Sequence, residues 1–401
     1  MKKPISEQTW YAAFVGFVSI GIGLSLCRVA FAPVIPDLVD FHWMTRTQAG
    51  WSSSANYFGY AAGLLVIIKV SCHIDRRWLF RFALIAGTVS LLACAIDLGF
   101  IWLAAWRLVQ GLVGTVMMVL VPGLVLKSVP INRQRIAGSI TMAGAGGFTF
   151  AMSLLLPAAK SYGPTADWLI YGGICAVFSA TIWPFFSVHA KGKGMDTVSM
   201  GRIARPNRRT YVLLWAGYLT LAIAAVPGYI YLSDYMHVAL HASEVLSQKL
   251  YSLFGLGMFL GALIAGLLSQ WLGNYYSILL LVILLLASNV VTLLSTRPEL
   301  VAWGSFFFAF AGLGVVTIAS LRTLELVGIN AHPKFWARMC IAYALGQLVS
   351  SLVYAEILQM QIAYISIFWI AEFILVLTFV LFILAYMKEP TPENLEPIEV
   401  D

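Results

Sequence analysis

Charged residues are scarce in this chain of 401 residues, at 11% of the sequence, where a soluble domain carries about 25%. Hydrophobic residues reach 60%, and the mean hydropathy is +0.86. So much apolar surface cannot be hidden from water behind so few charges, which excludes a soluble globular protein. The chain also lacks the alternation of polar and apolar residues that outer-membrane barrels require. The composition therefore predicts an all-α polytopic membrane protein.

Cysteine is rare as well, and the five cysteines are scattered without the CxxC spacing of metal sites. We therefore expect no disulfide framework and no metal site. The motifs HExxH, GxSxG and the lysine-containing phosphate loop are missing, so we expect neither an enzyme, nor a bound cofactor, nor an ATP-driven pump. The net charge is +7, but no basic segment is interleaved with aromatics, so nucleic-acid binding is not expected.

Long apolar runs predict twelve membrane-spanning helices of about 20 residues each. The expected spans are Trp10–Ala32, Gln48–Val70, Leu79–Ile96, Phe100–Leu120, Ile136–Leu156, Trp168–Val188, Tyr211–Leu232, Leu246–Leu268, Tyr275–Ser295, Leu300–Leu321, Met339–Glu356 and Tyr364–Tyr386.

Lysine and arginine are divided unevenly between the two sides of these spans. Of the 25 such residues, two lie well within predicted helices, away from their ends, and only Arg46, Lys160, Lys249 and Arg297 fall on the side opposite the N-terminus. The other 19 share the side of the N-terminus. Because basic residues concentrate on cytoplasmic loops, both termini are predicted to be cytoplasmic. We expect a multi-pass protein of the bacterial cytoplasmic (inner) membrane.

The chain divides near its midpoint. Residues 189–209 are basic and contain glycine, and they predict a cytoplasmic linker between an N-terminal six-helix bundle (1–188) and a C-terminal one (210–387). The acidic, proline-containing tail, 388–401, is predicted to be disordered. Two GxxxG pairs, Gly59/Gly63 and Gly257/Gly261, stand 198 residues apart and indicate an internal repeat.

Several segments resemble the major facilitator superfamily of transporters. The stretch RLVQGLVG, which begins at Arg107 and includes Gln110, is similar to the R-x-x-Q-G-x-G motif of the fourth helix in that superfamily. The segment SCHIDRRWLFR resembles its cytoplasmic loop motif, with Asp75 and Arg76 in place and Arg81 one position late. The segment FAPVIPDL, with TRTQAGWSSSANYFGYAAG after it, is similar to the YbfB/YjiJ-like branch. The resemblance implies two pseudo-symmetric six-helix bundles that rock about a midplane cavity by alternating access.

Two arginines fall inside predicted spans, where a charge costs about 2.5–3.5 kcal/mol on insertion scales. Arg28 lies late in the first span and Arg107 near the middle of the fourth. The resemblance implies that both helices line the cavity, where a guanidinium group can bind a carboxylate through two parallel hydrogen bonds. For Arg107 the alternative is that it binds backbone carbonyls and a neighbouring helix.

Polar and aromatic residues complete the predicted substrate site. A stripe at helical spacing in the second span and its counterpart in the eleventh predict cavity lining, although hydrogen bonding between packed helices is the alternative. A Pro-Gly step in the seventh span predicts a kink that places a tyrosine. The residues expected to bind substrate beside the two arginines are Asn56, Tyr57, Tyr60, Gln110, Tyr229, Tyr343 and Gln347.

Proton coupling requires a titratable group in the pathway, and burial would raise the pKa of a carboxyl group towards neutrality. The candidates are Asp37 just beyond the first span, Glu356 at the end of the eleventh and Glu372 within the twelfth. The resemblance implies a gating role for Asp75, Arg76 and Arg81, which would tie helices together on the cytoplasmic face.

The sequence thus predicts a monomeric secondary transporter for a small organic solute, anionic or zwitterionic, coupled to protons. Its partners would be this solute, protons and the lipid bilayer. A multidrug or metabolite efflux carrier is the alternative, because aromatic residues make up 13% of the chain. The missing Gly-Pro in the fifth span disfavours proton-driven drug efflux. A membrane sensor that does not transport, built on the same scaffold, is a remote third hypothesis.

Overall fold

The computed structural model describes residues 5–70, 73–130, 133–189 and 208–387, and nearly all of them are helical. The first half of the chain forms α1 (Ile5–Ile20), η1 (Gly21–Leu26), η2 (Val29–Val34), α2 (Ile35–Asp40), α3 (Arg46–Val70), α4 (Arg76–Ala93), α5 (Phe100–Lys127), α6 (Gln134–Leu155), η4 (Leu156–Ala158), η5 (Lys160–Tyr162) and α7 (Pro164–His189). The second half forms α8 (Arg208–Val226), η6 (Pro227–Tyr231), α9 (Leu232–Val238), α10 (Glu244–Leu294), α11 (Pro298–Gln359) and α12 (Ile365–Met387).

These elements make twelve membrane-spanning segments, as predicted. The helix α10 counts as two because Gly273 breaks it with a φ of 74°, and α11 contains two apolar stretches, Pro298–Val327 and Phe335–Gln359. By length and composition alone, nine helices in the described part of the chain qualify as spans, with α10 counted once and α3 and α4 excluded. The mean hydropathy of α3 is lowered by polar side chains that are buried against other helices, among them Ser54 and Asn56.

The outer surface of this helical assembly is apolar. Large hydrophobic side chains such as Phe82, Ile101 and Phe373 are at least 72% exposed. Such a surface suits contact with lipid chains rather than water. The protein is therefore a multi-pass membrane protein.

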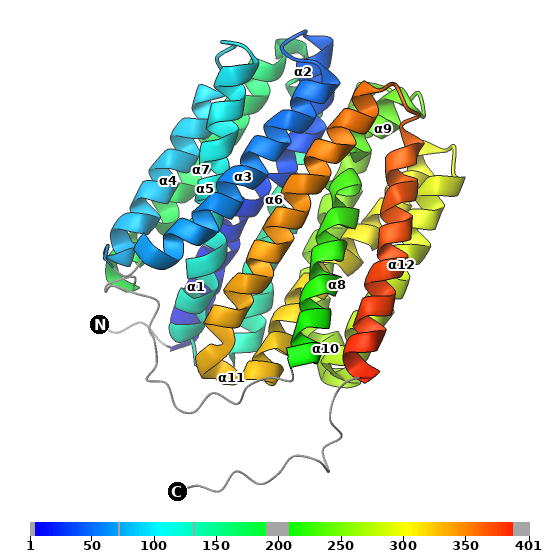
Figure 1. Ribbon diagram of the computed structural model, residues 1–401. Helices are drawn as coiled ribbons and strands as arrows, with labels where there is room; N and C mark the ends of the chain where they lie inside the picture. Colours follow the sequence, from blue (N-terminus) through cyan, green and yellow to red (C-terminus); the bar gives the residue numbers. More distant parts are fainter. Residues whose placement is uncertain (1–4, 71–72, 131–132, 190–207, 388–401) are drawn as a thin grey trace, which may run out of the picture.

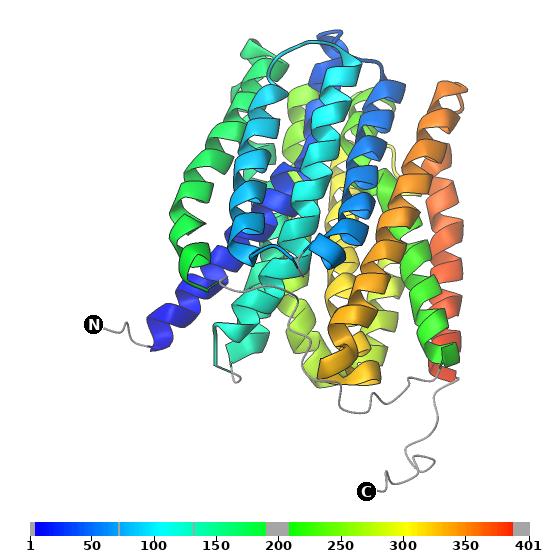
Figure 2. The same ribbon diagram turned by 60° about the vertical axis from the view of Figure 1, so that its left-hand side comes forward.

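The helices form two bundles, α1–α7 and α8–α12, which stand side by side (Figure 1). Across the boundary α3 packs against α11, and α6 packs against α10 (Figure 2). The second contact requires glycine, because a Cβ atom on Gly146 would overlap the backbone of Phe259, and one on Gly255 would overlap that of Phe150. The limits predicted for the bundles, the linker (189–209) and the tail (388–401) stay predictions, since 190–207 and 388–401 are outside the described residues.

The two GxxxG pairs occupy matching places. Gly59 of α3 lies against the backbone carbonyl of Leu108 in α5, and Gly257 of α10 lies against that of Phe306 in α11. The second span therefore packs on the fourth in the same way as the eighth packs on the tenth. The expected pseudo-symmetry is confirmed.

The first span is not one continuous helix, and the prediction of a single helix over Trp10–Ala32 is wrong. The helix α1 ends at Ile20 and continues as the π-helical turn η1 and the 3-10 turn η2, with Arg28 between them at φ −146° and ψ −76°. Gly21 and Gly23 weaken the α-helix here, and the ring of Pro33 restricts the second turn. The seventh span is likewise interrupted, by the π-helical turn η6 that begins at Pro227.

The residues Ile5 and Met387 lie at one end of the molecule, called here the terminal end (Figure 1). The opposite end is called the distal end. Successive spans alternate in direction, so the distal end carries the turns with left-handed backbone at His42, Gly99, Gly163, His241 and Gln361.

Candidate functional site

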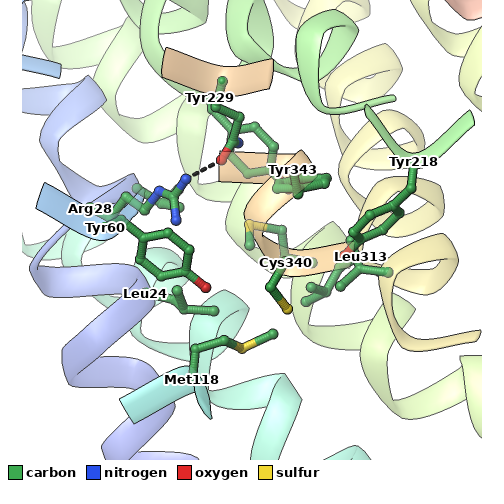
Figure 3. Close-up of a pocket in the computed structure, with 13 residues that line it drawn as sticks. Leu24, Arg28, Tyr60, Met118, Tyr218, Tyr229, Leu313, Cys340 and Tyr343 are labelled. Carbon is green, nitrogen blue, oxygen red and sulfur yellow. Dashed lines mark hydrogen bonds between the residues drawn. The ribbon is translucent and has the colours of Figure 1, made fainter. Parts of the chain in front are cut away.

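A cavity of about 60 Å³ lies between the two bundles at mid-height (Figure 3). It holds a few water molecules at most, so a larger solute enters only if the bundles move apart. The lining is mostly apolar and aromatic, with Arg28 as its single charged residue. The lining residues are Leu24, Arg28, Val29, Tyr60, Met118, Tyr218, Tyr229, Met258, Leu313, Val316, Cys340, Tyr343 and Gln347.

The break between η1 and η2 places Arg28 at this cavity. Its guanidinium group donates a hydrogen bond to Oε1 of Gln347 in α11, so this contact joins the two bundles. The guanidinium carbon lies 4.5 Å from the ring centroids of both Tyr57 and Tyr60 in α3. In the described part of the chain no carboxylate lies within ion-pair distance of Arg28. Arg28 is thus a positioned cation that no carboxylate of the described residues neutralises.

Arg107 has a different environment, although both arginines are predicted as substrate ligands. It is 1% exposed and is not among the cavity-lining residues. Its guanidinium group donates to the backbone oxygen of Cys27 at 3.1 Å and to Gln110 Oε1 at 2.7 Å, and it lies over the ring of Phe31 at 4.1 Å. These contacts agree with the alternative interpretation, in which Arg107 binds backbone carbonyls and a neighbouring helix rather than substrate.

Asn56 belongs to the same network. Its side-chain amide donates to the backbone oxygens of Cys27 and Arg107, each at 2.9 Å. Asn56 and Arg107 together satisfy the carbonyl that the backbone break leaves free at Cys27. Of the predicted substrate ligands, Asn56, Tyr57, Arg107 and Gln110 therefore surround the break, and Arg28, Tyr60, Tyr229, Tyr343 and Gln347 line the cavity.

The C-terminal bundle contributes aromatic side chains to the opposite wall. The π-turn η6 carries Tyr229, which lines the cavity together with Tyr343 of α11 (Figure 3). The centroid of the Tyr343 ring lies 4.8 Å from that of Tyr218 in α8. Tyr218 and Cys340 are site residues that sequence reasoning missed. No signal in the sequence distinguishes them from the other aromatic and small residues of their helices.

The distal end is closed by polar contacts between the bundles. Arg46 at the start of α3 binds Asp234 of α9 with a nitrogen–oxygen distance of 3.0 Å, and Asp234 also accepts a hydrogen bond from Tyr364. Nearer the cavity, the hydroxyl groups of Ser54 and Ser351 are 2.7 Å apart. These contacts join the two bundles on the distal side of the cavity.

The three predicted proton-coupling carboxylates are at different places. Glu372 accepts a hydrogen bond from Asn289 within the C-terminal bundle, and Glu356 accepts one from Trp51 across the bundles at the distal end. Asp37 of α2 is also at the distal end and is 0% exposed. None of them lines the cavity.

The predicted gating residues lie at the terminal end of the N-terminal bundle. Asp75 caps α4 by accepting a hydrogen bond from the backbone nitrogen of Arg77, and it forms an ion pair with the same residue at 2.8 Å. Arg81 lies over the rings of Trp78 and Trp183, which connects α4 to α7. The gating role of Asp75, Arg76 and Arg81 stays a prediction.

The architecture matches a transporter of known structure. The nucleoside transporter NupG superposes with a TM-score of 0.68 over 96% of this chain and 100% of that one, at 12% sequence identity. At that identity the likeness concerns the fold. The chain thus shares with that protein a fold of two six-helix bundles.

Sequence comparison identifies the protein family to which the chain belongs. A family described as "Uncharacterised MFS-type transporter YbfB" matches residues 19–383, and the chain belongs to this family, as the motifs indicate. A stretch of 91 residues is also 33% identical to "MFS-type transporter tndD" of Aspergillus flavipes. This stretch covers 22% of the present chain and 17% of that relative.

Proposed function

We propose that this protein is a proton-coupled secondary transporter for a small organic anion or zwitterion and that Arg28 binds the charged group of the solute. Alternating access would expose the cavity to one side of the membrane and then to the other. The observation that carries the proposal is the guanidinium group of Arg28, which lies in the cavity wall and has no carboxylate partner among the residues that the structure describes.

The lining favours this solute class on electrostatic grounds. A cation in apolar surroundings is unfavourable until an anion compensates it, and a guanidinium group presents paired donors that match a carboxylate. Around the cavity, the lining residues include no aspartate or glutamate to attract a cationic solute. The tyrosine rings suit the apolar part of a solute, and their hydroxyl groups suit its polar part.

A ligand screen by thermal stability tests this proposal. A solute that binds only the folded protein stabilises it by about 2.7 kcal/mol at a concentration one hundred times its dissociation constant. We expect small carboxylates or amino acids to raise the melting temperature of the purified protein, and lipophilic cations to leave it unchanged. Stabilisation by lipophilic cations alone would contradict the anion site and favour the efflux hypothesis.

We also propose that the terminal end faces the cytoplasm of a bacterial cell and that the protein acts as a monomer in the inner membrane. The support for the orientation is the concentration of lysine and arginine on the terminal side. In this orientation the distal contacts close the cavity towards the outside.

The orientation predicts the labelling of two thiols. The four cysteines in the described residues are buried, and the fifth, Cys72, lies outside those residues in a predicted cytoplasmic loop. A thiol reagent that does not cross membranes should label Gln361→Cys in intact cells, and label Cys72 only after permeabilisation. Cys72→Ser is the control for background, and labelling of Cys72 in intact cells would reverse the orientation.

A further inference from the structure

A pair of buried carboxyl groups lies at the distal end, away from the central cavity. Asp37 is in α2, Asp167 is in the first turn of α7, and both residues are 0% exposed. The two carboxyl groups lie close enough to influence each other. Asp37 is a candidate from the sequence, whereas only the fold brings Asp167 to it.

This pair lacks hydrogen-bond donors. Asp37 Oδ2 accepts from Nε2 of Gln248 at 2.9 Å. Within residues 5–70, 73–130, 133–189 and 208–387, no donor reaches Asp37 Oδ1 or either carboxylate oxygen of Asp167. Two ionised carboxylates in contact repel each other, and each one buried without donors costs several kcal/mol. One proton held between them makes one group a donor to the other and removes one of the two charges.

The charged residues nearby do not compensate the negative charge of two ionised carboxylates. Lys160 of η5 is close enough to influence Asp37, but its ammonium group is bound to Glu244 of α10. Asp40 adds negative charge on the same short helix and lies 3.8 Å from the His237 ring of α9. Burial raises the pKa of Asp37, and the hydrogen bond from Gln248, the neighbouring Asp167 carboxyl group and the charge of Lys160 act against this rise.

The pair also sits on the contact between the bundles. Gln248 belongs to α10, and the same amide nitrogen that binds Asp37 also donates to the backbone oxygen of Pro33 at 3.1 Å. The ion pair between Lys160 and Glu244 joins the bundles at the same level. A movement that opens the distal end therefore breaks the Gln248 contact and admits water to both carboxyl groups.

We propose that Asp37 and Asp167 form the proton-binding site of this transporter, holding one proton between them while the distal end is closed and releasing it when that end opens. This inference rests on the proposed function, because it assigns the proton of that coupled transport to named residues. Water stabilises two separate carboxylates in the open state, and closure removes that water, so closure requires uptake of one proton. The site is separate from Arg28, so solute binding and proton binding are measured independently.

Infrared spectroscopy of the purified full-length protein tests the site directly. The carbonyl stretch of a protonated carboxyl group is separate from the carboxylate bands, and it should be present at neutral pH and decrease at higher pH as the pair ionises. The double variant Asp37→Asn/Asp167→Asn should remove this signal, whereas Glu372→Gln, which changes a carboxyl group bound to Asn289, should leave the pH dependence of the signal unchanged. The titration of the unaltered protein needs no variant, so it stands even if a variant fails to fold. Absence of the signal at neutral pH, or its full persistence in the double variant, overturns the proposal.

A transport measurement separates this inference from the proposed function. In vesicles, Asp167→Asn should lose uptake driven by a pH gradient but retain exchange of the solute identified by the thermal screen and stabilisation by it. Uptake by Asp167→Asn that still follows the pH gradient overturns the assignment of the proton to this pair. If no organic anion binds, the proposed solute class fails, while the infrared result still decides whether the pair holds a proton.

Discussion

Replacement of Arg28 by glutamine is expected to lower the affinity for the transported anion by about 10- to 150-fold, since a hydrogen bond to a charged group contributes about 1.5–3 kcal/mol. Glutamine retains donors but loses the positive charge and the paired geometry of the guanidinium group. The fold should persist, because Arg28 contacts one side chain across the bundles and two tyrosine rings beside it. The measurements are uptake into vesicles and the shift in melting temperature caused by ligand.

Arg28→Lys is the matched control for this prediction. Lysine keeps the positive charge but presents it as a point charge without the planar fork. We expect its affinity to lie between those of the unaltered protein and of Arg28→Gln. If Arg28→Gln is folded and binds the anion as tightly as the unaltered protein, Arg28 is not a substrate ligand.

Replacement of Arg107 by alanine is expected to destabilise the protein by about 2–5 kcal/mol, the range for truncating a large buried side chain. The truncation removes the donor to Gln110 and one of the donors to the Cys27 carbonyl, and it leaves a hole beside Phe31. The melting temperature without ligand should therefore fall. The fraction that stays folded should bind the anion with affinity near that of the unaltered protein.

The outcome distinguishes the two interpretations of Arg107. An Arg107→Ala protein of normal stability that no longer responds to the anion would extend the substrate site to this residue. Arg107→Lys is the companion variant, because it restores the charge without the two hydrogen bonds in their present geometry. A loss of stability in Arg107→Lys as well would indicate that the hydrogen bonds, rather than the charge, support the backbone break.

The difference between the two arginines was not accessible from the sequence. Both are single cations in apolar helices, and helical periodicity places a residue on a face only while the helix is regular. The change from α1 to η1 and η2 alters that periodicity at Arg28, and it creates the free carbonyl at Cys27 that Arg107 binds. A break that depends on packing against helices such as α5 and α6 leaves only glycines and one proline as its trace in the sequence.

The sequence also predicted only part of the cavity lining. Tyr60, Tyr343 and Gln347 are predictable because a polar stripe on an apolar helix is costly unless it faces something polar. Tyr218 and Cys340 line the same cavity, but similar residues occur throughout these helices with no such role. The pair of Asp37 and Asp167 is also invisible in the sequence, since its members are 130 positions apart and belong to different spans.

The sequence by itself determined the membrane class, the number of spans, the internal repeat and the family. These depend on local properties, namely the cost of exposing apolar residues to water, the helix length that crosses a bilayer, and glycines at close helix contacts. Only the tertiary structure decided which arginine faces the cavity, which carboxyl groups meet, and which residues close the distal end. Those outcomes depend on contacts between spans far apart in the chain, and a local pattern does not encode the relative rotation of two packed helices.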